Sequence, residues 1–374
     1  MPHTINDFLA ELNEITGKKD SEKNMRQTIE LLEVADKLYN ENKKLQQKLS
    51  DPVEFQQKIS GQTFISEDFD NKNYKRPVVD LVQEGGTMLG IGLLGYTYIM
   101  EKAGVRFRSM AGTSAGAINT LLLSALPEKI YTEKSIFIKD GRPAVKSEFL
   151  AYLVANKDFC AFLDRKGFIG KIQIWLIKRI NKVARVLPYF LIGLSVFLLG
   201  LAFYSYHLLD KYLFNAGNGL TENQIMVYHF VTAIILIAAA FSLVILLIFA
   251  LLKKNMGVNP GTVVYDWLES ILHTDYVGIW TTKQLKDRKK KIKIENNGPN
   301  AAPFNDPRLV FISANLTHNR IVKFPENNAD YWQPNYVDLV SPAVYVRASM
   351  SLPFIFYALI PNDRHVHIPK DASL

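Results

Sequence analysis

The distribution of apolar and polar residues divides the chain into four stretches of different character. In the first, residues 4 to about 60 are rich in Glu, Lys, Gln and Leu, and apolar residues recur at roughly helical spacing. This pattern predicts one or two helices in an N-terminal arm over residues 1–73. Two roles are open for the arm, a solvated helical element that packs on the main domain or a partner-binding coiled coil. The absence of sustained heptads favours packing.

The second stretch, residues 74–165, alternates short strand-like runs with apolar helical runs. Residues 78–82 are rich in Val and Leu and lead into Gly85-Gly86, and residues 89–100 then have the pattern of an apolar helix. Residues 105–110 and 115–126 repeat the same order of strand and helix. Repeated β-α units predict a mainly parallel sheet covered by helices, so we expect an α/β fold.

The third stretch, residues 166–256, contains two long apolar segments. Residues 186–209 and 225–252 hold no Lys, Arg, Asp or Glu, and about 20 such residues suffice to cross a bilayer. Basic residues precede the first segment and follow the second, whereas the connecting link holds only Lys211. Because positive charge stays on the cytoplasmic side, we expect a transmembrane hairpin with both ends in the cytoplasm. Residues 168–186 suit an amphipathic helix on anionic lipid.

The fourth stretch, residues 257–374, returns to the pattern of a globular protein. Residues 263–272 read as a helix and residues 309–314 as a buried strand, so the insert interrupts one domain. Residues 286–293 are nearly all basic and could contact phosphates of lipid or nucleic acid, although a solvated loop is the commoner interpretation. No aromatic platform accompanies this charge, and we therefore expect no nucleic-acid partner.

Composition narrows the class of protein without naming it. The chain has 374 residues, 48% of them hydrophobic, which is enough to bury a substantial core, and a net charge of +8. Cys160 is the single cysteine, so no intrachain disulfide can form and a reducing compartment fits. The N-terminus lacks a basic start followed by an apolar run, so we expect the chain to begin in the cytoplasm.

The first candidate for chemistry is a G-x-S-x-G sequence between a predicted strand and a predicted helix. A tight turn at this place needs glycines to hold the serine clear of the sheet. The start of the helix would favour negative charge developing on a substrate oxygen. Ser114 is therefore the candidate nucleophile, and the alternative is a serine that only caps the helix. The other elbow residues are Gly112, Ala115 and Gly116.

A second candidate is the glycine-bearing turn at residues 84–90, Glu-Gly-Gly-Thr-Met-Leu-Gly. It lies between the first predicted strand and helix, where backbone N–H groups can face an anion. A dinucleotide site would need G-x-G-x-x-G, and the spacing here differs. An oxyanion hole is the better interpretation.

These two motifs, in this order, resemble patatin-like phospholipases. The similar segments are Asp80–Gly86 with Gly90-Ile91-Gly92, and Ala111–Ala117, followed later by Ala314–Thr317 and Arg347–Phe354. The resemblance implies a three-layer fold and hydrolysis of membrane-lipid acyl esters by a Ser-Asp dyad without histidine. It implies Ser114 as the nucleophile and an oxyanion hole lined by Gly85, Gly86, Thr87 and Gly90.

The chain departs from the family pattern at two places. The family's glycine loop usually reads G-G-G-x-[KR]-G, whereas Thr87 and Leu89 stand here for the third glycine and the basic residue. No Asp-Gly-Gly or Asp-Gly-Ala follows Phe356, and Asp363 and Asp371 read as loop carboxylates. We therefore expect this second part of the domain to be truncated, with the dyad aspartate beyond residue 374.

The remaining residues predict neither metal nor cofactor. His365 and His367 form an i, i+2 pair without a nearby constellation of carboxylates, which favours a satisfied surface pair. The sequence thus predicts a membrane-anchored serine acyl hydrolase that releases fatty acid from phospholipids. The alternative is a catalytically inactive scaffold that uses the fold and the N-terminal helices to bind a partner.

Overall fold

The computed structural model describes most of the chain outside residues 163–258. The described residues are 4–17, 20–43, 47, 64–68, 71–86, 90–162, isolated positions between 200 and 237, 259–290, 294–296, 306–352 and 355–368. The chain divides into two compact units. The first comprises residues 1–162, 261–352 and 358–374, and the second comprises residues 163–260 and 353–357.

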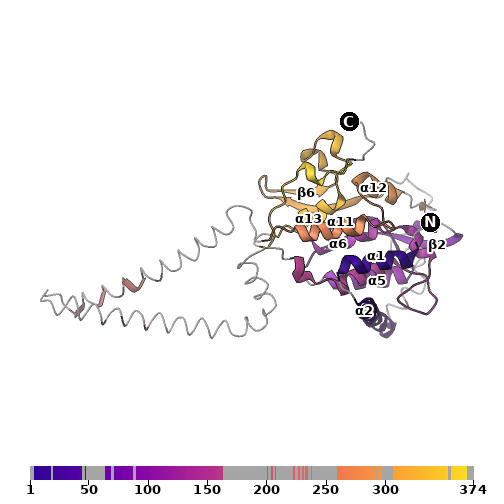
Figure 1. Cartoon of the computed structure of the whole chain (residues 1–374), viewed down its shortest axis with the longest axis horizontal. Coiled ribbons are helices and arrows are strands. Elements are labelled where there is room, and N and C mark those ends of the chain that lie inside the picture. The colour runs from indigo at the N-terminus through magenta and orange to yellow at the C-terminus, as the bar shows by residue number, and fades with distance from the viewer. Residues whose placement is uncertain are drawn as a thin grey trace. The chain divides into compact units, whose positions relative to one another are not determined.

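The first unit is built on a six-stranded sheet with the order β4-β1-β2-β3-β5-β6. Two of its strands, β2 and β6, are labelled in Figure 1. Its three central strands, β2, β3 and β5, are parallel to one another, and the three outer pairings are antiparallel. The strands are β1 (Phe64–Asp68), β2 (Asn71–Gln83), β3 (Arg106–Gly112), β4 (Ile294–Asn296), β5 (Leu309–Asn315) and β6 (Arg320–Phe324).

The prediction of a mainly parallel sheet is therefore wrong, because the sheet of the described residues is mixed. Strand β6 follows β5 after a short turn in which Asn319 adopts a φ of 47°. A short turn returns the chain antiparallel to the strand it has just left, whereas a parallel neighbour needs a long crossover. Strand β1, which lies within residues that the sequence assigned to the helical arm, pairs antiparallel with the start of β2.

The elements around the serine motif agree with the sequence. Helices were predicted at residues 89–100, 115–126 and 263–272, and strands at 105–110 and 309–314. Each has its counterpart in the first unit, which confirms an α/β fold. The helices are α1 (Ile5–Thr16), α2 (Ser21–Glu41), α5 (Gly90–Lys102), α6 (Ala115–Ala125), α7 (Lys146–Asn156), α11 (Thr262–Leu272), α12 (Thr282–Lys290) and α13 (Pro342–Ser349), with short 3₁₀ turns η2 (Glu128–Thr132), η3 (Phe159–Phe162), η5 (Asn328–Asp330), η6 (Pro334–Tyr336) and η7 (Asp363–His365).

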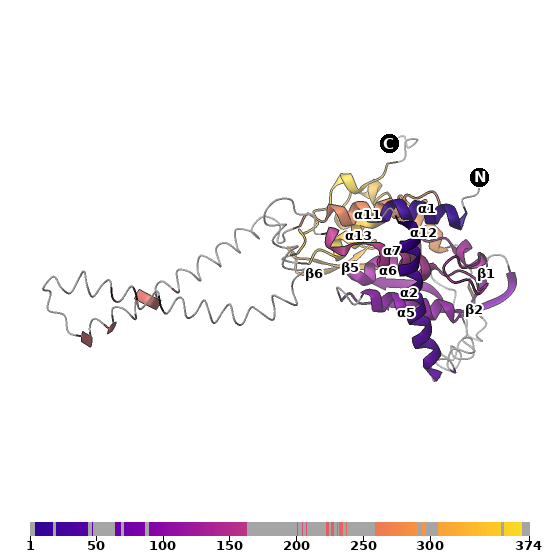
Figure 2. The ribbon, with the colours of Figure 1, turned by 60° about the horizontal axis from the view of Figure 1, so that its bottom comes forward.

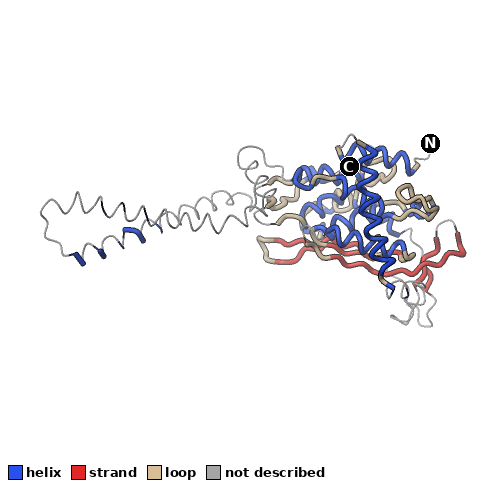
Figure 3. Tube along the Cα trace, turned by 90° about the horizontal axis from the view of Figure 1, so that it is seen from below, coloured by secondary structure: helices blue, strands red, loops and turns tan. Residues whose placement is uncertain are grey.

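The helices of the first unit lie mostly on one side of the sheet (Figure 3). Helix α6 packs against β3, and α13 packs against β5. The side chains of β6 differ in burial between the two faces of the sheet. Val322 and Phe324 are buried, whereas Ile321, which points to the opposite face, is 69% exposed. Among the described residues, the sheet thus has one helical layer, and the third layer implied by the family resemblance is not seen.

The N-terminal helices are part of the first unit's core. Thr4 and Asp7 form a capping box at the start of α1, and Gly17 ends the helix with a φ of 69°. Phe8 is fully buried, and its ring stacks on that of Tyr276 at 4.6 Å. Helix α2 lies across α5 and α7 (Figure 2). These contacts confirm that the N-terminal helices pack on the main domain.

The basic segment after residue 282 also differs from its prediction. Residues 286–290 belong to α12 rather than to a solvated loop. Lys289 is 3% exposed, and its ammonium group donates to the Phe107 carbonyl at 3.0 Å. Burial lowers the pKa of Lys289 to about 7. Lys289 is therefore part of the core, and the sequence alone could not distinguish it from the half-buried Lys286, three residues earlier.

The predicted membrane hairpin lies mostly outside the described residues. Among the residues that the structure does describe, no helix has both the length and the apolar character needed to span a bilayer. Within the second unit, Asn259 pairs with residues 355–357. Its N–H donates to the Ile355 carbonyl and its carbonyl accepts from the Tyr357 N–H, both at 2.8 Å.

Candidate active site

Ser114 occupies a strained turn between β3 and α6. Its backbone dihedrals are φ 52° and ψ −119°, a region that side chains other than glycine rarely enter. Such strain costs on the order of 1–3 kcal/mol and persists where the surroundings enforce it, often at functional sites. Ser114 occupies the N-cap position of α6 but makes no side-chain capping hydrogen bond. Among the described residues, Ser114 therefore lacks the side-chain hydrogen bond that a capping role would require.

Three glycines make this turn possible, because a side chain at any of them would collide with the backbone or with Ser114. A β-carbon on Gly112 would lie 2.4 Å from the Gly116 carbonyl oxygen, and one on Gly116 would lie 2.4 Å from the Gln83 carbonyl oxygen. A β-carbon on Gly85 would lie 2.3 Å from the β-carbon of Ser114. The spacing G-x-S-x-G is thus a packing requirement of this fold, and Gly85 belongs to the same constellation.

The glycine loop after β2 lies directly against the elbow. Gly85 faces Ser114, and a β-carbon on Gly90 would lie 3.0 Å from that of Ala115. Among the described residues, the N–H groups of Gly85, Gly86 and Ala115 have no hydrogen-bond acceptor. Unused donors near a serine hydroxyl at a helix start are suited to an oxyanion. Thr87, also predicted for this role, lies outside the described residues.

Ser349 holds the elbow from the opposite end of the sequence. The Ser114 N–H donates to Ser349 Oγ at 2.7 Å, and Ser349 Oγ donates to the Ile312 carbonyl on β5 at 2.6 Å. The sequence pointed to the segment Arg347–Phe354 through its family resemblance but assigned Ser349 no role. This hydroxyl fixes the serine turn to the central sheet and to the last residue of α13.

The described residues do not supply a base for Ser114. Within the part of the chain that it describes, no carboxylate is hydrogen-bonded to the Ser114 hydroxyl. Asp363 is exposed in η7, in agreement with its prediction as a loop carboxylate, and Asp371 lies outside the described residues.

The sequence that forms the glycine loop, the strained serine turn and the following helix was compared with known protein families. The family model of patatin-like phospholipases matches residues 81–371, which include both motifs. The chain belongs to the patatin-like phospholipase family. It is therefore related to lipid acyl hydrolases in general. No match was found among curated proteins or among solved structures.

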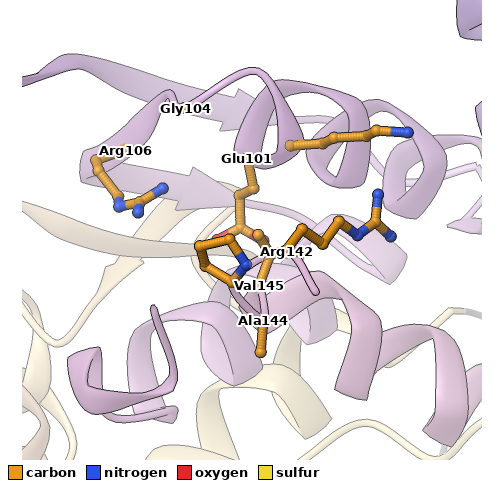
Figure 4. Close-up of a pocket in the computed structure, with 8 residues that line it drawn as sticks. Glu101, Gly104, Arg106, Arg142, Ala144 and Val145 are labelled. Carbon is orange, nitrogen blue, oxygen red and sulfur yellow. The ribbon is translucent and has the colours of Figure 1, made fainter. Parts of the chain in front are cut away.

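A small cavity of about 70 Å³ lies elsewhere in the first unit (Figure 4). It is lined by Glu101, Arg106, Arg142 and neighbouring residues, and none of the elbow residues contributes to it. Its charges are already engaged, since Glu101 accepts from the Ser147 N–H at 2.8 Å and Arg142 donates to Glu148 at 3.1 Å. The cavity is too small for a lipid acyl chain and supports the fold rather than the site.

The predicted histidine pair is neither at the surface nor without a carboxylate. His365 and His367 are both half-buried, and His367 Nε2 lies 2.8 Å from Glu269 Oε1 on α11. His273, four residues after Glu269, also belongs to this cluster. Burial alone would raise the pKa of Glu269, but hydrogen bonds from His367 and Tyr265 outweigh it and lower the pKa. Because these residues are far apart in the sequence, only the fold brings them together.

Proposed function

We propose that this protein is a serine acyl hydrolase that releases fatty acids from phospholipids at a cytoplasmic membrane surface. The strained backbone of Ser114 beside the glycine loop is the observation that carries this proposal. Ser114 Oγ attacks the ester carbonyl, the lipid alcohol leaves, and an acyl-enzyme forms that water then hydrolyses. The N–H groups of the loop and of Ala115 stabilise the negative oxygen of each tetrahedral intermediate.

The proposal requires a base that takes the proton of Ser114. In keeping with the family resemblance, we assign this role to an aspartate outside the described residues, which would form a dyad with Ser114. A hydroxyl without such a base is a weak nucleophile. The chemistry uses no metal and no cofactor, since carboxylate and backbone donors suffice for it.

Membrane anchoring is proposed from residues 186–209 and 225–252. The isolated positions that are described within the second segment support it, because several large apolar side chains there are strongly exposed. Their exposed fractions are 68% for Met226, 60% for Val227, 69% for Phe230, 51% for Ile234 and 58% for Ile237. Exposed apolar side chains of this number are suited to lipid contact. Protease protection in sealed vesicles tests the hairpin, and cleavage of the link 210–223 from the cytoplasmic side would contradict it.

Labelling with a serine-reactive fluorophosphonate tests the catalytic proposal. Protein from its natural source should be labelled and should release fatty acid from phospholipid vesicles, and Ser114→Ala should lose both properties. Ser124→Ala is a matched control, because Ser124 is a buried serine of the same helix and has no hydrogen-bond partner among the described residues. Full activity in Ser114→Ala would disprove the proposal. Absence of labelling in the natural protein would favour the inactive scaffold.

A further inference from the structure

Glu269, His273 and His367 converge in the first unit, although no part of the proposed hydrolysis uses them. Each offers one possible metal-ligand atom, and these atoms all lie within 4.8 Å of one another. All three side chains are half-buried. Glu269 and His273 are four residues apart on and just after α11, a spacing that puts both on one face of a helix.

His367 reaches this face from the C-terminal segment, where the backbone holds it firmly. Its N–H donates to the Leu339 carbonyl at 3.0 Å, and the neighbouring Val366 pairs with Val340 in an antiparallel bridge. Because α11 and the C-terminal segment are fixed independently, the three side chains converge without needing an ion to bring them together. Preorganisation of this kind lowers the cost of binding.

The surroundings of His273 indicate that its ring nitrogen is available. The Trp280 ring stacks on the His273 ring at 3.6 Å and meets the His367 ring edge-on at 5.7 Å. His273 Nε2 is buried yet has no hydrogen-bond partner within the described residues, which is a costly state for an imidazole nitrogen.

We propose that Glu269, His273 and His367 form a binding site for Zn²⁺ or a similar first-row divalent ion, which fastens the C-terminal segment to α11. Two imidazoles and one carboxylate suit Zn²⁺, and three protein ligands leave a fourth position for water. Bonds of about 2.0–2.2 Å place tetrahedral ligand atoms roughly 3.3 Å apart, so small side-chain rotations suffice to close the site. On binding, the hydrogen bond between His367 and Glu269 is replaced by two metal bonds, and the ring proton of a neutral His367 moves from Nε2 to Nδ1 by exchange with water.

Zinc titration of the purified full chain tests this site. After removal of metal with EDTA, the protein should take up one Zn²⁺ per chain in competition with a chromophoric chelator. Loss of any one ligand should weaken Zn²⁺ binding by at least about 100-fold, because changing residues that only support the ligands already costs about 10- to 100-fold. The variants are His273→Ala, His367→Ala and Glu269→Gln. His318→Ala is the matched control, since His318 is exposed in the turn between β5 and β6 and should bind as the unaltered protein does.

Two further measurements separate loss of ligation from loss of folding. In EDTA, the variants should still unfold in one cooperative transition, and added Zn²⁺ should raise the melting temperature of the unaltered protein but not that of the variants. With Co²⁺, His273→Cys should bind and show a thiolate charge-transfer band that His318→Cys lacks. The proposal is overturned if the unaltered protein takes up no stoichiometric Zn²⁺, or if both His273→Ala and His367→Ala bind it unchanged.

Discussion

The Ser114 N–H donates a hydrogen bond of 2.7 Å to the side chain of Ser349, 235 residues further along the chain. In serine hydrolases with this turn, the orientation of the nucleophile depends on the backbone of the elbow. Since Ser349 also bonds to β5, it connects the elbow to the sheet at a point that the glycines do not reach. Ser349 is therefore a positioning residue for the proposed nucleophile.

Ser349→Ala should lower kcat for phospholipid hydrolysis by about 10- to 100-fold with little change in KM, because misplacement of a reacting group by about 1 Å costs this much. The rate of fluorophosphonate labelling should fall in parallel. Ser351→Ala is the control, since among the described residues the Ser351 hydroxyl bonds only to Arg347. Equal rates for the Ser349 and Ser351 variants would show that the hydrogen bond to Ser114 is not needed for reactivity.

Gly116→Ala should destabilise the protein by about 1–3 kcal/mol, because the added methyl group would meet the Gln83 carbonyl oxygen at 2.4 Å. Gly95→Ala provides a contrast, since Gly95 lies inside α5 with no atom within 4 Å of the added group. There the change should stabilise by about 0.5–1 kcal/mol through better helix propensity. Thermal unfolding of the two variants should give shifts of opposite sign, and shifts of the same sign would contradict the close approach at Gly116.

Glu148 should make stability depend on pH. Burial raises the pKa of Glu148 from 4.5 to about 7, and the nearby Arg142 only partly opposes this effect. A raised pKa means that the folded state holds the proton more tightly, so this stabilisation is present below pH 4.5 and is lost as pH rises to 7. Over that window, the stability of the unaltered protein relative to Glu148→Gln should fall by about 3 kcal/mol. If the difference in free energy of unfolding between the unaltered protein and Glu148→Gln is the same at both pH values, the raised pKa is contradicted.

Phe8→Ala should lower the free energy of unfolding by about 3–5 kcal/mol, because the fully buried ring of Phe8 packs against Phe149 and Tyr276. Leu38 lies in α2 and is 63% exposed, so Leu38→Ala should change the free energy of unfolding by less than about 0.5 kcal/mol. Denaturant unfolding compares the two. A small effect at Phe8 would mean that the N-terminal helix is a detachable arm, as the partner-binding interpretation of the sequence requires.

The parts of the fold that were predictable from sequence are those set by local chemistry. The strand before the elbow, the elbow and α6 follow from adjacent glycines and from the periodicity of the residues on either side. The Gly112–Gly116 spacing is itself a local packing rule, which the structure explains through its contact with Gln83. Family membership followed from the same motifs.

The parts that were missed depend on contacts between distant residues. Nothing near Ser349 in the sequence refers to Ser114, and nothing near His367 refers to Glu269, 98 residues earlier. The antiparallel strands β1 and β6 were missed because pairing direction depends on the turn and the neighbouring strand rather than on the pattern of one strand. Lys289 was interpreted as exposed because it belongs to a run of charged residues. The run lies on a helix, however, and one side of that helix faces the core.

The parallel pairing of β3 with β5 has a consequence for how the protein is made. Residues of β3 leave the ribosome early, but β5 and Ser349 follow only after the whole of residues 163–260. A nascent chain therefore carries Ser114 in an elbow whose neighbouring strand and supporting hydroxyl are still missing. Order of synthesis alone thus delays completion of the proposed nucleophile until the predicted membrane segments have already emerged.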